Sequence, residues 1–172
     1  MSATRLVTLA DADALAELYS ANRDFLTPWE PVRNDDFYTA DGERAVIGDA
    51  LARHAQGTAL PHVICDGSGL VAGRITLNNI VRGAFQSCDL GYWVSAALNG
   101  RGLATGAVRE MIGQAISGLG LHRIQAATLP HNAASQKVLA RNGFTQIGMA
   151  PEYLHTAGRW QDHFIYHVVA PG

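Results

Sequence analysis

The segment NGRGLAT (residues 99–105) concentrates glycines at the point where a helix must begin. A glycine inside a helix costs roughly 1 kcal/mol relative to alanine, so Gly100, Gly102 and the nearby Gly106 need a physical reason. A turn between a strand and a helix is one reason. Anion binding is another, because free amides at a helix N-terminus can approach a phosphate closely where no Cβ intervenes, and Arg101 adds positive charge. The spacing therefore indicates either a simple turn or a pyrophosphate site.

Two well-known phosphate-binding motifs do not fit this segment. A dinucleotide fingerprint requires G-x-G-x-x-G and an acidic residue about 20 positions later. Here the third glycine falls one position late, at Gly106, and the following segment HRIQAATL (122–129) contains no acidic residue. A nucleotide P-loop requires Gly-Lys-Ser/Thr, whereas this chain continues with Ala107 and Val108. The remaining specific interpretation is a binding site for the pyrophosphate of some other ligand.

The same segment resembles the acetyl-CoA loop of the GCN5-related N-acetyltransferase (GNAT) superfamily, which follows the pattern Q/R-x-x-G-x-G/A. Asn99 stands where that pattern has Gln or Arg, and Gly102 and Ala104 fill the two small positions. The resemblance extends to the branch that acetylates the N-termini of ribosomal proteins, and the matching segments follow the expected order along the chain. They are NRDFLTPWEP (22–31), LGYWV (90–94), GRGLAT (100–105), NAASQKVLARNGF (132–144) and GRWQDHFIYHV (158–168).

The resemblance implies a binding site for acetyl-CoA. In the superfamily, backbone N–H groups of the strand before the glycine loop polarise the thioester carbonyl where that strand bulges away from its neighbour, and Val94 and its neighbours match this place. Asn132 has two compatible interpretations, a helix N-cap and a side-chain contact with the pantetheine arm. The residues assigned to acetyl-CoA are Trp93, Val94, Asn99, Gly100, Arg101, Gly102, Leu103, Ala104, Thr105, Asn132 and Ser135.

The resemblance also implies catalytic residues. The superfamily often uses a tyrosine to protonate the leaving thiolate, but Leu139 occupies that position, so Ser135 is the candidate group beside the sulfur. Its alternative is an ordinary serine on a helix surface. For the base, Ala127 replaces a glutamate used elsewhere in the superfamily, which leaves Glu152 as the first candidate and Asp89 as the second. Either could instead be a solvated carboxylate. A weak base suffices for a terminal α-amine, whose pKa is about 8 against about 10.4 for lysine.

The acceptor side is expected at the loop 27–40, which Pro28 and Pro31 keep irregular. Its aromatic residues form either a small core or the wall of a peptide cleft. Asp35 and Asp36, together with a neighbouring glutamate, favour a cationic amine. The residues assigned to the acceptor are Trp29, Glu30, Phe37 and Tyr92.

Hydrophobic periodicity predicts an α/β domain with a mixed sheet. The GNAT resemblance adds that the central sheet is mostly antiparallel, is flanked by helices, and belongs to a single domain over residues 1–172. Two apolar runs around a DGSG turn indicate a β-hairpin at 62–77. Further strands are expected at 4–9, 87–95, 122–129, 144–152 and 160–169, and helices at 11–26, 42–55, 103–119 and 132–144.

Composition and charge exclude several function classes. Of the 172 residues, 48% are hydrophobic and 16% charged, as in a globular protein. The net charge of −2 and the lack of a Lys/Arg cluster predict no direct nucleic-acid binding. The sequence shows neither a signal peptide nor a run of about 20 apolar residues, so we expect a cytoplasmic protein without a membrane span. Cys65 and Cys88 lack metal-ligand spacing and are expected as reduced core residues, with a disulfide between them as the alternative.

Two other chemistries lack support in the sequence. His163 and His167 would lie roughly 13 Å apart along a strand, and no other cluster completes a tetrahedral set, so no metal is predicted. Ser68 lies in a hairpin turn and not in the G-x-S-x-G elbow of a serine hydrolase.

The sequence therefore predicts an N-acetyltransferase that moves an acetyl group from acetyl-CoA to a primary amine by direct attack in a ternary complex. The expected acceptor is the N-terminal α-amine of a protein, such as a ribosomal protein. A small amine acceptor (aminoglycoside-like or a polyamine) and a non-catalytic acetyl-CoA-binding module are the alternatives. The sequence leaves the oligomeric state open, and a homodimer is compatible with it.

Overall fold

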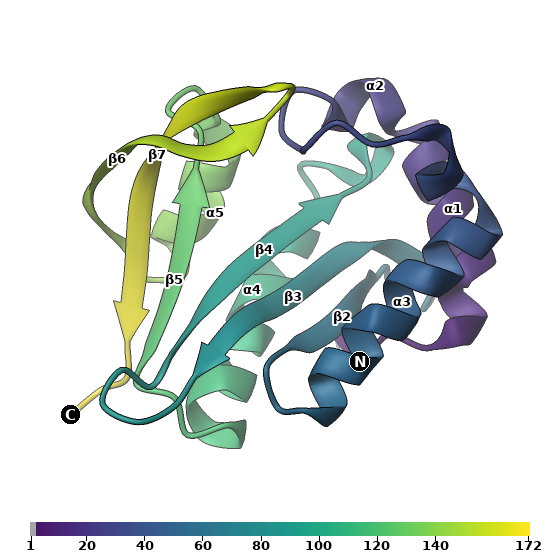
Figure 1. Cartoon of the computed structure of the whole chain (residues 1–172). Helices are drawn as coiled ribbons and strands as arrows, with labels where there is room; N and C mark the ends of the chain where they lie inside the picture. Colours follow the sequence, from purple (N-terminus) through teal and green to yellow (C-terminus); the bar gives the residue numbers. More distant parts are fainter. Residues whose placement is uncertain (1–2) are drawn as a thin grey trace.

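The computed structural model describes residues 3–172, and its centre is a seven-stranded sheet in the order β1-β2-β3-β4-β5-β7-β6 (Figure 1). The pair β4–β5 is parallel and every other neighbouring pair is antiparallel. The predicted mixed, mostly antiparallel sheet is thus confirmed. The strands are β1 (Thr4–Leu6), β2 (Leu60–Cys65), β3 (Val71–Val81), β4 (Ser87–Val94), β5 (Arg123–Thr128), β6 (Thr145–Thr156) and β7 (Arg159–Val169).

Helices cover both faces of the sheet. Helices α1 and α3 lie on one face, and α4 and α5 lie on the other (Figure 1). No helix within residues 3–172 is long and apolar enough to cross a membrane. The α-helices are α1 (Ala12–Ala21), α2 (Arg23–Leu26), α3 (Ala40–Ala55), α4 (Leu103–Gly113) and α5 (Ala133–Arg141). The shorter turns are η1 (Leu9–Asp11), η2 (Asp35–Tyr38), η3 (Ala96–Leu98) and the π-helical η4 (Gln114–Gly118).

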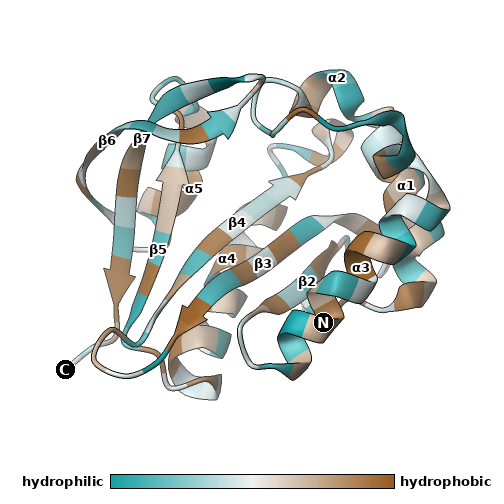
Figure 2. Cartoon of the chain, viewed as in Figure 1, coloured by the Kyte–Doolittle hydropathy of each residue, from teal (hydrophilic) through white to brown (hydrophobic). Residues whose placement is uncertain are grey.

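Apolar side chains from the sheet fill the space under each helical layer. The larger cluster lies between the sheet and α4, with Ile75, Leu77 and Met111 fully buried. A smaller cluster under α1 and α3 includes Leu15 and Ile47. Hydrophobic residues dominate β2 and much of β3, whereas α3 alternates hydrophobic and hydrophilic positions (Figure 2). Each free cysteine is buried in one of these clusters.

Several predicted boundaries are wrong at the first helices and strands. The helix expected over 11–26 is interrupted at Asn22, whose side-chain Oδ1 accepts a hydrogen bond from the Ala96 amide at 2.8 Å, while its Nδ2 donates to Ser95 Oγ at 3.1 Å. These long-range bonds compete with helix continuation. The expected loop 27–40 contains the turn η2, and the strand expected over 4–9 ends at Leu6.

The parallel pair β4–β5 is short, and this opens the sheet. Only Ser87, Cys88 and Asp89 of β4 pair with β5, and beyond Asp89 the two strands diverge (Figure 1). The expectation that this strand moves away from a neighbour near Val94 fits β5, whose pairing with β4 ends at Asp89, and not β3, with which β4 keeps an unbroken register from Asp89 to Val94. Separation from β5 leaves one backbone edge of β4 without a strand partner near Val94.

Candidate active site

A cleft of about 880 Å³ opens where β4 and β5 separate, and it runs between the α1–α2 side and the α4–α5 side of the sheet. Most of the residues predicted from the sequence line it. These are Trp29, Glu30, Tyr92, Trp93, Val94, Asn99, Gly100, Gly102, Leu103, Ala104, Thr105, Asn132 and Ser135. The predicted residues Phe37, Asp89, Arg101 and Glu152 are not among its lining residues.

The glycine segment presents unpaired backbone amides at the start of α4. Gly102 is the helix N-cap with φ of +80°, and the Gly106 amide makes the first bond of the helix, to the Gly102 carbonyl at 2.9 Å. Within residues 3–172, the amides of residues 100–105 have no backbone partner. A Cβ built at Gly100 or Gly102 would meet no protein atom within 4 Å. The open space and the free N–H groups fit a pyrophosphate.

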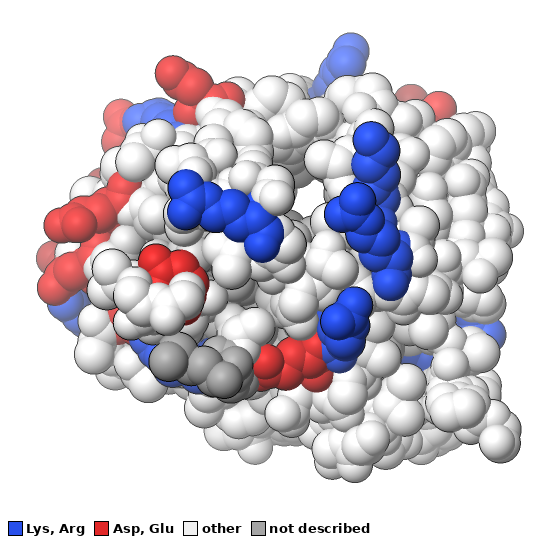
Figure 3. Space-filling model, turned by 180° about the vertical axis from the view of Figure 1, so that it is seen from behind, with Lys and Arg blue, Asp and Glu red and all other residues white. Residues whose placement is uncertain are grey.

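Basic side chains add to this anion-binding character. Lys137 and Arg141 of α5 line the same cleft as the glycine segment. Seen from the α4–α5 side, the molecule is hollowed near its centre, and Lys and Arg side chains gather around the hollow (Figure 3). A ligand with several phosphate groups is therefore complementary to this end of the cleft.

Ser135 forms a hydrogen-bonded pair with Tyr92. The Tyr92 hydroxyl lies 2.9 Å from Ser135 Oγ and 3.3 Å from the Ser135 carbonyl oxygen. Asn132 caps α5, because its Oδ1 accepts a hydrogen bond from the Ser135 amide at 3.1 Å. Burial raises the pKa of Tyr92 to about 12, so this phenol remains a neutral donor near neutral pH. Tyr92 is predicted on the acceptor side, and in the structure its hydroxyl pairs with Ser135.

The part of the cleft predicted to take the acceptor is aromatic, and Glu30 is the one acidic residue among the described residues that line the cleft. Tyr19, Leu26 and Phe37 form a buried cluster, and Trp93 Nε1 donates to the Tyr19 hydroxyl at 2.8 Å. Glu30 is half-buried in the loop after α2, and its carbonyl oxygen accepts from the Ala157 amide at 2.9 Å. This bond ties the loop to the β6–β7 hairpin.

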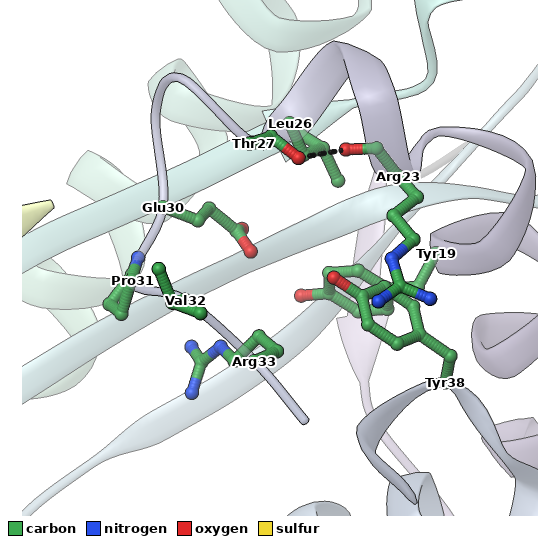
Figure 4. Close-up of a pocket in the computed structure, with 9 residues that line it drawn as sticks. All are labelled: Tyr19, Arg23, Leu26, Thr27, Glu30, Pro31, Val32, Arg33 and Tyr38. Atoms are coloured by element: carbon green, nitrogen blue, oxygen red, sulfur yellow. Dashed lines mark hydrogen bonds between the residues drawn. The ribbon is translucent and has the colours of Figure 1, made fainter. Parts of the chain in front are cut away.

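The Glu30 carboxylate also borders a smaller pocket of about 180 Å³. Figure 4 shows the Glu30 carboxylate and the hydroxyl groups of Tyr19 and Tyr38 pointing into this pocket. Burial raises the pKa of Glu30 above its ordinary value, and the positive charges of Arg33 and Arg74 oppose that rise. A partly desolvated carboxylate in this place can hold an ammonium group or accept a proton from it.

The two carboxylates predicted as the base lie elsewhere. Asp89 is in the paired part of β4, where its Oδ2 accepts a hydrogen bond from Asn79 Nδ2 at 2.9 Å. Glu152 is exposed in an irregular part of β6 with φ of +46°, and its amide donates to Asp162 Oδ1 at 2.9 Å. Leu154, two residues later, does line the cleft. A role for either carboxylate therefore remains a prediction.

Sequence reasoning missed a polar row on β3. Arg74, Thr76 and Asn78 all line the cleft, whereas Ile75 and Leu77 between them are buried on the other face. The alternation in RITLN could have indicated this row, because successive strand residues face opposite sides.

Two histidines that the sequence analysis considered for metal binding lie in different surroundings. His163 is buried and lines the cleft, with Nδ1 2.9 Å from the Gln161 carbonyl oxygen, whereas His167 contacts Arg123. Within the part of the chain that the structure describes, no group of three or more His, Cys, Asp or Glu residues is arranged to hold a metal ion.

Comparison with known proteins identifies this architecture. Residues 4–145 match the Acetyltransferase (GNAT) domain. A ribosomal protein uS5-alanine N-acetyltransferase of Escherichia coli is 38% identical over 168 residues, which cover 97% of this chain and 87% of that protein. The probable N-acetyltransferase YjcK of Bacillus subtilis is 34% identical, with 97% and 93% covered.

Solved structures of N-acetyltransferases have a similar fold. Mycobacterium smegmatis RimJ, in complex with CoA-disulfide, has a TM-score of 0.93 and 32% identity, with 97% of this chain and 81% of that chain covered. The ribosomal-protein-S5-alanine acetyltransferase of Vibrio fischeri has a TM-score of 0.91 and 33% identity, with 96% and 91% covered. Given this family match and these relatives, the chain belongs to the GNAT acetyltransferases and is an N-acetyltransferase that uses acetyl-CoA.

Proposed function

We propose that the protein transfers the acetyl group to the N-terminal α-amine of a protein, by direct attack within a ternary complex. The observation that carries this proposal is the continuity of the cleft, which joins the amides of residues 100–105 at one end to the Glu30 carboxylate at the other. Ser135 also lines this cleft. The relatives named as uS5-alanine N-acetyltransferases support a ribosomal protein with N-terminal alanine as the acceptor.

In the proposed reaction, the neutral amine nitrogen attacks the thioester carbonyl carbon, and the C–S bond then breaks to give an amide and CoA thiolate. The unpaired edge of β4 near Val94 provides backbone N–H groups for the developing oxyanion. Ser135 donates a hydrogen bond to the thiolate, while Tyr92 supports its hydroxyl. The amine proton passes to a carboxylate. Glu30 is in the cleft, and Glu152 or Asp89 would have to act through water.

The proposal is tested with an acceptor screen. Short peptides with a free N-terminal Ala, Ser or Met are compared with Nα-blocked peptides that carry a free lysine, and with polyamines. Mass spectrometry locates the acetyl group on the product. We expect α-amine acetylation, with the alanine peptide preferred. Acetylation restricted to lysine side chains or polyamines would overturn the proposal and favour the small-amine alternative.

A further inference from the structure

A buried ion pair lies beneath the acceptor side of the cleft and has no part in the reaction described above. Glu43 of α3 is 0% exposed, and its Oε2 lies 3.3 Å from Nη2 of Arg74 on β3. The contact is not aligned as a hydrogen bond, so neither Glu43 oxygen has a hydrogen-bonding partner among the described residues. Burial of an unsatisfied carboxylate is unfavourable, and it persists here because Arg74 offsets its charge.

The Arg74 guanidinium is held in place but retains free donors. Its side chain is only 14% exposed, it packs 5.9 Å from the Tyr19 ring centroid, and it pairs across the strands with Trp93. Its Nη2 has no aligned hydrogen-bonding partner within residues 3–172. Since Arg74 lines the cleft, donors that Glu43 does not use remain available there.

Glu30 and Arg74 act on the same region of the cleft. Both line it, and the charge of Arg74 opposes the rise in the Glu30 pKa. Tyr19 links the two residues, because its ring centroid lies 5.9 Å from Arg74 Cζ and it lines the smaller pocket together with Glu30. Arg33 is the other cation near Glu30 and also lines the cleft, but its side chain is exposed and its guanidinium lies over the Phe37 ring, whereas Arg74 is largely buried.

We infer that Arg74 binds the carbonyl oxygen of the acceptor's first residue while Glu30 binds its α-amine. An amine nitrogen and a carbonyl oxygen separated by one carbon are found in every protein N-terminus and are absent from a lysine side chain and a polyamine. A carboxylate beside an arginine with free donors is complementary to that pair of groups. Glu43 is a positioning residue, since it orients Arg74 without reaching the substrate. This inference rests on the proposed function and names the specificity-determining group at the same site.

The inference is tested with two peptides that carry the same free N-terminal alanine. One is an ordinary peptide, and in the other a trans-alkene isostere replaces the first peptide group, which keeps the shape and removes the carbonyl oxygen. The variant is Arg74→Met combined with Glu43→Gln, because Arg74→Met alone would leave a buried uncompensated charge. The matched control is Arg44→Met combined with Asp41→Asn, which removes an exposed ion pair from α3. Thermal unfolding and acetyl-CoA binding of each protein are measured beside kcat and KM.

We expect wild type to prefer the ordinary peptide about 10- to 150-fold in kcat/KM, the range for a hydrogen bond to a charged group. The Arg74→Met/Glu43→Gln variant should lose that preference, mainly through a higher KM for the ordinary peptide, and the Arg44→Met/Asp41→Asn control should keep it. Glu43→Gln alone should give an intermediate preference. An equal preference in wild type and in the Arg74→Met/Glu43→Gln variant would overturn the inference. The absence of any α-amine acetylation by wild type would instead overturn the proposed function.

Discussion

Replacing Ser135 by alanine removes the hydroxyl that we place beside the sulfur of acetyl-CoA. The interaction is strongest when negative charge develops on sulfur, so the substitution should lower kcat and leave acetyl-CoA affinity nearly intact. A hydrogen bond to a charged group contributes about 1.5–3 kcal/mol, which corresponds to a loss of roughly 10- to 150-fold.

Tyr92 gives this prediction a second, independent measurement. Its hydroxyl is 2.9 Å from Ser135 Oγ, and it remains protonated because burial raises its pKa to about 12. Removing that neutral hydrogen bond with Tyr92→Phe should cost about 0.5–1.5 kcal/mol, or roughly 2- to 12-fold in kcat. Because Tyr92 acts through Ser135, Tyr92→Phe should change little once Ser135 is alanine. The double variant should therefore be about as active as Ser135→Ala alone.

The assay is single-turnover acetyl transfer to an N-terminal peptide, with released CoA detected by a thiol reagent and acetyl-CoA affinity measured by calorimetry. Tyr166→Phe is the matched control, since the Tyr166 hydroxyl is part-buried, donates to Gln146 in β6, and lies outside the cleft lining. Wild-type kcat in Ser135→Ala would refute the role of the hydroxyl. If the losses in kcat of the two single variants add fully in the double variant, Tyr92 does not act through Ser135, and that part of the proposal is refuted.

Three further predictions concern phosphate binding, the base and acid stability. Gly102→Val and Gly57→Val should lose similar stability, about 1–2 kcal/mol, because both glycines have positive φ, but calorimetry should show weaker acetyl-CoA binding only for Gly102→Val. Glu30→Gln should lower kcat/KM for a peptide α-amine about 10²-fold at pH 7, and part of this loss should be recovered at pH 9, where more of the amine is neutral. A larger loss in Glu152→Gln or in Asp89→Asn, the two matched variants, would assign the base to that carboxylate instead. A hydrogen bond from Arg5 lowers the pKa of Asp11 to about 2, so ionised Asp11 stabilises the folded state above about pH 4 and loses that effect as the pH falls through 2. In urea titrations, Asp11→Asn should therefore reduce the unfolding free energy by about 1–2 kcal/mol at pH 7 and by little at pH 2.

Much of the fold could be predicted because local patterns determine it. The alternating burial of Ile124, Ala126 and Thr128 in β5 is a period of two that the sequence displays directly. The glycines before α4 indicate a helix start with free amides, and Asn132 indicates the start of α5. In each case the residues that determine the structure lie within a few positions of one another.

The boundaries that could not be predicted depend on distant residues. Helix α1 ends at Asn22 because its side chain bonds to Ser95 and Ala96, more than 70 positions away in the chain. The separation of β4 from β5 after Asp89 depends on the pairing of two strands that α4 connects. Neither the helix end at Asn22 nor the separation of β4 from β5 has a local sequence signature. Periodicity therefore predicted a helix that continues through Asn22, and only the family resemblance predicted the path of the chain near Val94.

The same distinction explains which parts of the candidate site could be predicted from the sequence. The acetyl-CoA side is built from contiguous motifs, because a helix N-terminus and its glycine segment can present a row of amides without help from distant residues. The acceptor side combines Glu30 from a loop, Tyr19 from α1 and Arg74 from β3, and Arg74 is held by Glu43 from α3. No spacing rule relates these four positions. On our inference that Arg74 binds the acceptor, specificity depends on tertiary packing, and substitutions at the buried Glu43 should alter acceptor choice although its side chain is not exposed.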